Sequence, residues 1–385
     1  MHVAQISFFA DPAQRAPEEL LKAWPSLVDI AECAASSGVR VSVIQASTHT
    51  QTFHRNGVSY RFLPMGRAAS PTAPLGTLPG VLRDLAPDLF HVHGLGFGQD
   101  VFQLSQIAPD APILLQDHAD APPRFWRRTA WRRNAAVISG VAFCARQQSQ
   151  RFADAGLLQR RVPIYEIPES SSRFTPGNQE EARRALGVAA AAPLILWVGH
   201  LNDNKDPLTV LKGLSLAARN LPDAQLWCCF GTAPLLTAVR KRIDGDPVLR
   251  DRVRLLGCAS HAEIETLMRA ADLFVLGSHR EGSGYSLIEA LACGLPPVVT
   301  DIPSFRALTG QGAVGMLWPP DNSHALCEAL LAMTDHIGSP VRAAVRAHFD
   351  AELSFESVGR KLAAAYHDLL MRKRGSTWSR RGVSL

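Results

Sequence analysis

The sequence of 385 residues has little of what secreted and membrane proteins depend on. Its seven cysteines are an odd number without a C-x-x-C pair, which favours free thiols in a reducing cytoplasm over a disulfide framework. No uninterrupted apolar run approaches the ~20 residues of a membrane span. The first residues, MHVAQISFFADP, lack a basic segment and soon reach an acid, so we expect no secretory signal.

Charge is also sparse, at 19% of residues with a formal net charge of +5, whereas 46% of residues are hydrophobic. This balance is typical of a globular protein and excludes a disordered chain. We find no cluster of Cys and His at metal-ligand spacing and no nucleic-acid motif, so neither a metal site nor a nucleic-acid partner is expected.

Short apolar runs alternate with helical patterns along the whole chain. A first series of predicted strands covers 3–9, 39–44, 89–94, 111–118 and 136–144, and a second covers 192–200, 223–231, 252–257, 271–278 and 295–301. An amphipathic helix is expected around 17–37. Apolar strands separated by helices predict parallel sheets covered on both faces, so two series predict two doubly wound, Rossmann-like α/β domains.

The domain boundaries follow from composition. Residues 161–180, RVPIYEIPESSSRFTPGNQE, are rich in Pro, Ser and Gly and are the expected connection. We therefore predict an N-terminal domain over 1–170 and a C-terminal domain over 171–350. A C-terminal helix over 351–373 is expected to pack back toward the N-terminal domain, and 374–385 form a basic tail.

The segment HREGSGYSLIEALACG (279–294) carries the strongest functional signal. A glycine-rich turn stands between a predicted strand and a helix, at the carboxyl edge of a parallel sheet where ligands bind. Glycines let a diphosphate approach the backbone, and helix N–H groups attract it. Glu281 and Glu289 would be repelled by phosphate, so we expect them to bind the diols at the two ends of a nucleotide sugar. The alternative for Glu289 is a capping box with Ser286.

The stretch EGSGYSLIEALACGLPPVVTDIPSFRAL resembles the E-x7-E region of the family-4 retaining glycosyltransferases, which have the two-domain GT-B fold with a cleft between the domains. WVGHLNDNKDPLTVLKG, PDLFHVHG and LLQDHAD extend the resemblance over most of the chain. It implies that Glu281 contacts hydroxyls of the donor sugar and that Glu289 holds the ribose diol. The backbone around Gly282, Ser283, Gly284 and Tyr285 would line the donor site.

The resemblance implies four further site residues. Lys205 matches the lysine that neutralises the donor diphosphate, although a solvated loop lysine is the alternative. His118 matches the first-domain histidine near the reacting sugar, although a lone His is more often structural. Backbone groups of Cys258 and Ala259 would border the base pocket. His91 and His93 are expected to be packing or hydrogen-bonding residues.

The sequence departs from the family at three places. His200 stands where an arginine is usual, and histidine is charged only in part near neutral pH. The loop FFADPAQRAPEE (8–19) has two prolines and no glycine where family members often have a glycine-rich loop. PESSSRF stands where an Asn-Gly-Val-Asp type of turn is common. The last two departures leave the class of acceptor open.

Residues 121 to 153 contain seven arginines and no acid. Within 122–136, PPRFWRRTAWRRNAA, arginines at a helical spacing of four alternate with aromatic residues. Three interpretations stay open: a surface helix with solvated arginines, peripheral contact with an anionic membrane, and a pocket for an anionic acceptor.

The resulting expectation is a cytoplasmic, retaining hexosyltransferase that moves a sugar from a nucleotide sugar to a hydroxyl of a glycan, lipid or small molecule, without a cofactor or an essential metal. Three alternatives remain: a nucleotide-sugar epimerase or hydrolase of the same fold, a glycoside hydrolase, and a catalytically weakened binding protein suggested by His200. The glycoside hydrolase is disfavoured because its two carboxylates flank the scissile bond, whereas Glu281 and Glu289 share one turn and helix.

Overall fold

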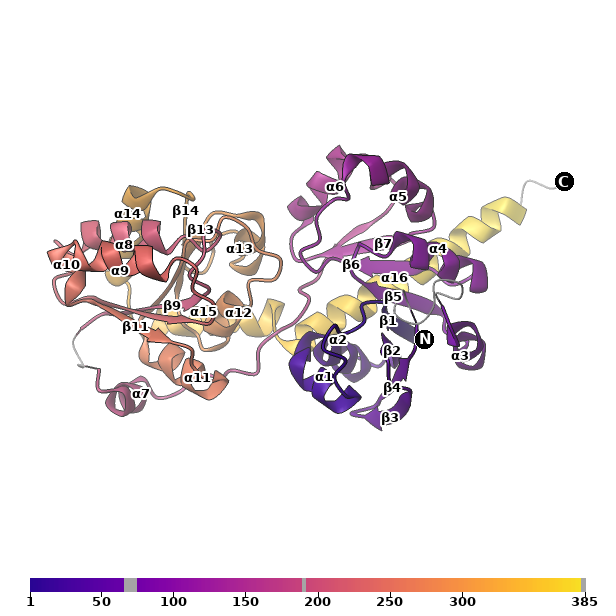
Figure 1. The fold of residues 1–385 in the computed structure, drawn as a ribbon, viewed down its shortest axis with the longest axis horizontal. Helices are drawn as coiled ribbons and strands as arrows, with labels where there is room; N and C mark the ends of the chain where they lie inside the picture. Colours follow the sequence, from indigo (N-terminus) through magenta and orange to yellow (C-terminus); the bar gives the residue numbers. More distant parts are fainter. Residues whose placement is uncertain (66–74, 189–191, 382–385) are drawn as a thin grey trace. The chain divides into compact units, whose positions relative to one another are not determined.

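A computed structural model of the chain describes residues 1–65, 75–188 and 192–381 (Figure 1). The chain divides into two compact units, the first made of Met1–Ser170 with Phe355–Leu385 and the second of Ser171–Ser354. Each unit is a sheet covered by helices on both faces. Among the helices of the described ranges, none is long and apolar enough to cross a bilayer.

The first unit is built on an eight-stranded sheet of order β3-β4-β2-β1-β5-β6-β7-β8. Its strands are β1 (His2–Ser7), β2 (Arg40–Ala46), β3 (Gln51–Arg55), β4 (Val58–Leu63), β5 (Leu89–His93), β6 (Ile113–Gln116), β7 (Gly140–Phe143) and β8 (Ile164–Glu166). All neighbouring strands pair in parallel except β3, which forms an antiparallel hairpin with β4. The central strands are buried on both faces, which is why they are continuous apolar runs.

Helices divide the apolar residues of the first unit into two cores. They are α1 (Pro17–Ala23), α2 (Pro25–Ser36), α3 (Leu78–Leu85), α4 (Gly98–Ile107), η1 (Phe125–Arg127), α5 (Arg128–Ala135), η2 (Arg146–Ser149), α6 (Gln150–Asp154) and α16 (Phe355–Arg381). Val3 of β1 belongs to the core under α1, α2 and α16, whereas its neighbour Ala4 belongs to the core under α3 to α6. Successive strand residues point to opposite faces, so a single strand serves both cores.

The C-terminal helix α16 is an integral part of the first unit. Val358, Leu362, Tyr366 and Leu369 are buried with residues of α2 in one core. The helix continues to Arg381, past its expected end at 373, so part of the expected basic tail is helical. Gly359 lies at the crossing with α2, where a Cβ would meet the carbonyl oxygen of Cys33.

The second unit has a six-stranded, fully parallel sheet of order β11-β10-β9-β12-β13-β14. Its strands are β9 (Leu194–Gly199), β10 (Gln225–Phe230), β11 (Val253–Gly257), β12 (Leu273–Leu276), β13 (Pro297–Thr300) and β14 (Met316–Trp318). Its helices are α7 (Gln179–Leu186), α8 (Pro207–Ala217), α9 (Leu236–Asp244), α10 (Pro247–Arg250), α11 (His261–Ala270), α12 (Tyr285–Ala292), α13 (Pro303–Leu308), α14 (Ser323–Thr334) and α15 (Ser339–Glu352). The prediction of two Rossmann-like α/β sheets is therefore confirmed.

All ten strands expected from the sequence exist, each within a few residues of its expected range. The predicted helix over 17–37 was wrong in one respect, because it breaks into α1 and α2 at Trp24. Pro25 explains the break, since proline has no N–H to donate within a continuous helix. Four short strands, β3, β4, β8 and β14, were not predicted.

The crossing of α16 and α2 yields a stability test. Gly359→Ala should lower the free energy of unfolding by about 1–3 kcal/mol, because the new Cβ would meet backbone that cannot yield like a side chain. Thermal and denaturant unfolding measure the effect. Gly80→Ala is the matched control, since a Cβ at this α3 position meets nothing within 4 Å and should stabilise the helix slightly. Equal behaviour of the two variants would contradict close packing at Gly359.

Candidate functional site

The second unit has a pocket of about 460 Å³ at the carboxyl edge of its sheet. From β9 at the centre of the sheet, β10 and β11 follow toward one edge, and β12, β13 and β14 follow toward the other edge. The order therefore reverses between β9 and β12, which is the place where open α/β sheets bind ligands. The pocket is lined by Val198, Gly199, His200, Lys205, Cys229, Phe230, Gly231, Cys258, Ala259, His261, Ile264, Glu281, Tyr285, Ser286 and Glu289.

The pocket brings together seven of the eleven expected site residues: His200, Lys205, Cys258, Ala259, Glu281, Tyr285 and Glu289. Three more, Gly282, Ser283 and Gly284, form the turn that joins Glu281 to α12. His118 belongs to the first unit. Seven of the fifteen lining residues were thus expected from the sequence, although their segments are far apart in the chain.

Lys205 and Glu281 form an ion pair across the strand-order reversal. Lys205 stands in the loop after β9, Glu281 stands after β12, and their side chains are only 14% and 12% exposed. A half-buried charge is costly without an opposite charge, so each stabilises the other in the absence of a ligand. Among the described residues that line the pocket, Lys205 alone carries a permanent positive charge.

Gly284 begins α12 in a conformation that other residues adopt with strain. Its φ is +64°, and a Cβ would approach Phe305 and Leu308 to 3.0 Å. The capping-box alternative for Ser286 and Glu289 was wrong, because α12 starts at Tyr285 with Gly284 as its N-cap and has no side-chain cap. Glu289 is therefore not used to begin the helix.

Glu289 lies inside α12 with its side chain 17% exposed. Burial raises the pKa of this carboxyl to about 7. Its nearest ionisable neighbour with a recorded contact is His261, whose Nδ1 lies 3.7 Å from Oε1 on an exposed side chain. Glu289 is a buried acid that exchanges its proton near neutral pH, which is a common property of ligand-binding carboxylates.

His200 is held by a backbone hydrogen bond. The N–H of Thr232 donates to Nδ1 of His200 at 3.2 Å. Because Nδ1 accepts this hydrogen bond, the ring carries its proton on Nε2 and is neutral in this arrangement. His200 therefore offers one N–H donor to the pocket instead of the two-pronged cationic contact of an arginine.

The far wall of the pocket contains residues that the sequence did not indicate. Phe230 and Cys229 end β10, and His261 begins α11 beside Cys258 and Ala259. His261 packs edge-on against Phe174. No local motif marks these residues, and their one usable signal is position: Cys229 and Phe230 end a predicted strand, and His261 lies four residues after the next one.

In the first unit, His118 follows β6 and forms an ion pair with the buried carboxylate of Glu169. Burial opposes charge on the ring, but the hydrogen bond and charge of Glu169, with Asp120 and Asp117, outweigh it and raise the pKa of His118. Nε2 of His118 lies 3.1 Å from Nδ1 of His93. Burial lowers the pKa of His93 far below its usual value, so the His93 ring is neutral.

His91 and His93 are fully or almost fully buried, and each forms a side-chain hydrogen bond. His91 accepts from or donates to the hydroxyl of Tyr366 on α16 at 2.8 Å. Burial lowers the pKa of His91 to about 3. Glu169 is the functional neighbour that the sequence missed, because it stands 51 positions from His118 inside the connecting segment.

The pKa of Glu289 predicts a pH-dependent stability. Between its usual pKa of 4.5 and about 7, the folded protein keeps a proton on Glu289 that the unfolded chain releases, so stability falls as pH rises through this window. Glu289→Gln removes the effect and should stabilise the ligand-free protein at pH 8 relative to wild type, by at most about 3 kcal/mol. The two proteins should be nearly equal at pH 4.5.

Thermal unfolding of both proteins at pH 5 and pH 8 measures this difference. The matched control is Glu328→Gln, which changes an exposed glutamate of α14. Its effect should be small and the same at both pH values. A Glu289→Gln effect that does not change with pH would rule out the raised pKa.

Comparison with known proteins agrees with this geometry. Residues 178–340, which include every residue that lines the pocket, match the family model "Glycosyl transferases group 1". A GDP-mannose:cellobiosyl-diphosphopolyprenol alpha-mannosyltransferase of Xanthomonas oryzae pv. oryzae is 24% identical over 319 residues, 80% of each chain. A D-inositol 3-phosphate glycosyltransferase of Geodermatophilus obscurus is 30% identical over 243 residues, 60% of this chain and 52% of the relative.

Solved structures share the fold at low identity. The structure of Anabaena HepE in complex with UDP and glucose has a TM-score of 0.66 at 18% identity, over 96% of this chain and all of the other. The chain thus has the GT-B fold, and its residues 178–340 are similar to the glycosyl transferases group 1 family.

Proposed function

We propose that this chain is a family-4 retaining glycosyltransferase that moves a hexosyl group from a nucleotide diphosphate sugar to an acceptor hydroxyl. One observation carries the proposal: a single pocket at the strand-order reversal holds Lys205, two buried carboxylates and the start of α12. A cation and helix N–H groups suit a diphosphate, and carboxylates suit the hydroxyls on either side of it.

Binding of the diphosphate would change the partner of Lys205. In the ligand-free protein its ammonium group pairs with Glu281. A diphosphate between the loop after β9 and the start of α12 would take this ammonium as its counter-charge. Glu281 would then accept hydrogen bonds from hydroxyls of the donor sugar. The same ion pair thus keeps both groups in position before the donor arrives.

Glu289 would hold the ribose. A diol donates two hydrogen bonds to one carboxylate, and both oxygens of Glu289 are available to such a pair when the group is ionised. Phe230, Cys258 and Ala259 form the wall beside it, where the base would lie. The exposed His261 closes the same end of the pocket.

In the transfer step, the bond between the anomeric carbon and the diphosphate oxygen breaks, and the acceptor oxygen forms the new bond on the same face of the sugar. A phosphate oxygen takes the acceptor proton, so no enzymic base and no essential metal are needed. Lys205 and the Nε2–H of His200 would stabilise charge on the leaving diphosphate. From the family resemblance, we assign His118 to the reacting end of the sugar.

The expected acceptor is a lipid-linked glycan. The relative from Xanthomonas oryzae is named for transfer of mannose from GDP-mannose to a diphosphopolyprenol-linked sugar. The first unit of this chain exposes Phe125 by 74% and Trp126 by 58%, with the Arg124 guanidinium over the Trp126 ring. Trp131 differs, because it is buried and donates to the carbonyl of Leu95.

We therefore favour the membrane interpretation of segment 122–136. Apolar rings and arginines that project together are suited to the interface of an anionic bilayer. Arg128 and Arg132 are exceptions, since Arg128 donates to the carbonyl of Pro123 and Arg132 donates to the carbonyls of Ala155 and Gly156. The remaining arginines, with Phe125 and Trp126, form the proposed contact.

Donor binding is the first test of the proposed function. UDP or GDP, and the matching nucleotide sugar, should raise the thermal midpoint of the full chain. Lys205→Met should lower the affinity for the diphosphate by about tenfold to a hundredfold, as expected for the loss of a charge-assisted contact. Calorimetry measures the affinity. Lys212→Met, on an exposed lysine of the adjacent α8, should leave it unchanged.

The outcomes also separate the alternatives. No stabilisation by any nucleoside diphosphate at millimolar concentration would refute the donor site. Release of free sugar, or of an epimer, without an acceptor would favour a hydrolase or an epimerase. Donor binding without turnover on lipid-linked acceptors would favour a catalytically weakened binding protein. The observation behind this alternative is the neutral His200 where an arginine is usual.

Membrane contact is tested separately with lipid vesicles. The full chain should co-sediment with vesicles containing an anionic lipid and should dissociate as salt rises, because arginine attraction is screened. Replacing both Phe125 and Trp126 by Ala should weaken binding by at least tenfold. Met371→Ala removes another exposed apolar side chain, on α16, and is the control. Equal binding of the Phe125 and Trp126 double variant and of the Met371→Ala variant would argue for a solvated surface helix.

A further inference from the structure

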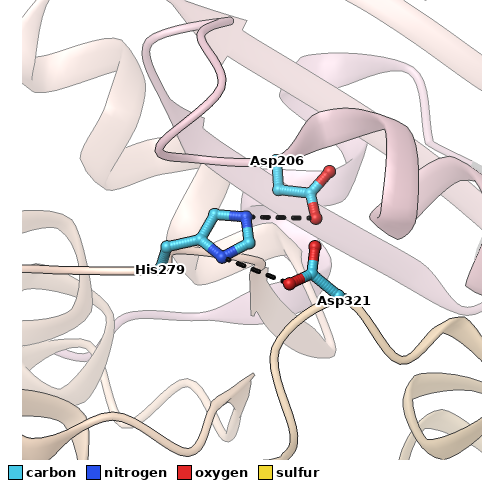
Figure 2. A group of neighbouring side chains, drawn as sticks. All are labelled: Asp206, His279 and Asp321. Carbon is cyan, nitrogen blue, oxygen red and sulfur yellow. Dashed lines mark ion pairs between the residues drawn. The ribbon is translucent and has the colours of Figure 1, made fainter.

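Three side chains from separate loops meet beside the pocket at the carboxyl edge of the second sheet (Figure 2). Asp206 is the N-cap of α8, His279 follows β12, and Asp321 precedes α14. One ligand atom of each lies within 4.8 Å of the others. Figure 2 shows both carboxylates directed toward the imidazole ring. A histidine with two aspartates is a set of ligands that divalent metal ions accept.

The distances within this group are long for hydrogen bonds. Nε2 of His279 lies 3.5 Å from Oδ2 of Asp206, and Nδ1 lies 3.7 Å from Oδ2 of Asp321. An N–H···O hydrogen bond spans about 2.7–3.2 Å. Ligands bound at 2.0–2.1 Å in tetrahedral geometry are about 3.3–3.4 Å apart. The first separation therefore fits two ligands of one ion better than it fits a hydrogen bond.

Asp206 provides a second, independent observation. Its Oδ1 accepts the N–H of Thr209 at 3.1 Å, which begins α8. The Asp206 side chain is only 13% exposed. Its Oδ2 is buried and has no hydrogen-bond partner among the described residues. A buried carboxylate oxygen without a donor is costly, and it points at the ring of His279. A bound cation would satisfy it.

We propose that Asp206, Nε2 of His279 and Asp321 bind one Zn²⁺ ion, with the exposed Asp321 side chain turning from Nδ1 toward the ion. One nitrogen and two carboxylate oxygens suit Zn²⁺ better than Mg²⁺ or Ca²⁺, which prefer oxygen ligands alone. Two aspartates balance the charge of the ion. Asp321 is 77% exposed, so water can complete a fourth position and the ion can enter from solvent.

The proposed ion would join the two loops that carry the pocket's ion pair. Asp206 directly follows Lys205, and His279 stands two residues before Glu281. The same loops are already tied by the N–H of His279 donating to Asn204 and by the Asn204 amide donating to the carbonyl of Arg280. The ion therefore has a structural role here and takes no part in the transfer step.

The competing explanation is a protonated His279 between two carboxylates, without a metal. It predicts close approach of the ring to both carboxylates but no dependence on added metal. Zn²⁺ alone, added to the untagged full chain in metal-free buffer, separates the two. Metal binding is measured by calorimetry and by thermal unfolding, so the result does not depend on the proposed donor or on activity.

We expect one Zn²⁺ per chain and a rise in the thermal midpoint. His279→Gln and Asp206→Asn should each weaken binding at least tenfold and remove the rise. Asp206→Asn is chosen because asparagine still accepts the N–H of Thr209 and keeps the start of α8. Asp321→Asn should also weaken binding, and His336→Gln, an exposed histidine outside the group, should not.

Two outcomes would overturn the proposal. The first is wild-type protein that binds no Zn²⁺ while His279→Gln lowers stability in metal-free buffer, which would establish the ion pair of His279. The second is Zn²⁺ binding that survives all three substitutions, which would place the ion elsewhere, for example on the exposed thiol of Cys258.

Discussion

The ion pair between Lys205 and Glu281 is the interaction on which the pocket depends. It joins the loops after β9 and β12, the two strands between which the sheet changes direction. Because both side chains are mostly buried, neither charge is stable there alone. A diphosphate that binds Lys205 must therefore offer at least as good a counter-charge, and the released Glu281 must find hydroxyl donors. This double requirement is the basis on which we propose a ligand with phosphate and polyol groups side by side.

The remaining electrostatics of the pocket follow from its shortage of positive charge. Thr232 fixes His200 as a neutral donor, so Lys205 faces two carboxylates among the residues that line the pocket. Burial moderates this imbalance, since the raised pKa of Glu289 leaves that group partly protonated near neutral pH. A ligand diol that donates to Glu289 favours the ionised form, so its binding is coupled to release of a proton.

Sequence reasoning was strongest where a local pattern carries a physical requirement. The turn at Gly284 needs a positive φ, and the apolar runs of β9 and β12 need burial on both faces, so both were visible without a structure. It failed where residues meet through topology alone. Asp206, His279 and Asp321 have no common spacing, and Glu169 reaches His118 from the connecting segment. The hairpin β3–β4 escaped because its first strand is short and largely exposed.

The sequence also could not show the hydrogen bonds among the histidines of the first unit, because one of these bonds is made to the last helix of the chain. Gln5 donates to the hydroxyl of Tyr366, which also forms a hydrogen bond with Nδ1 of His91. His91 stacks near His93 at 4.7 Å between ring centroids, and burial keeps both rings neutral. Neutral His93 forms a hydrogen bond with His118, whose second nitrogen pairs with Glu169. Of the three rings, His118 is the one whose surroundings raise its pKa and so favour a positive charge, while α16 contributes the hydroxyl that hydrogen-bonds to His91.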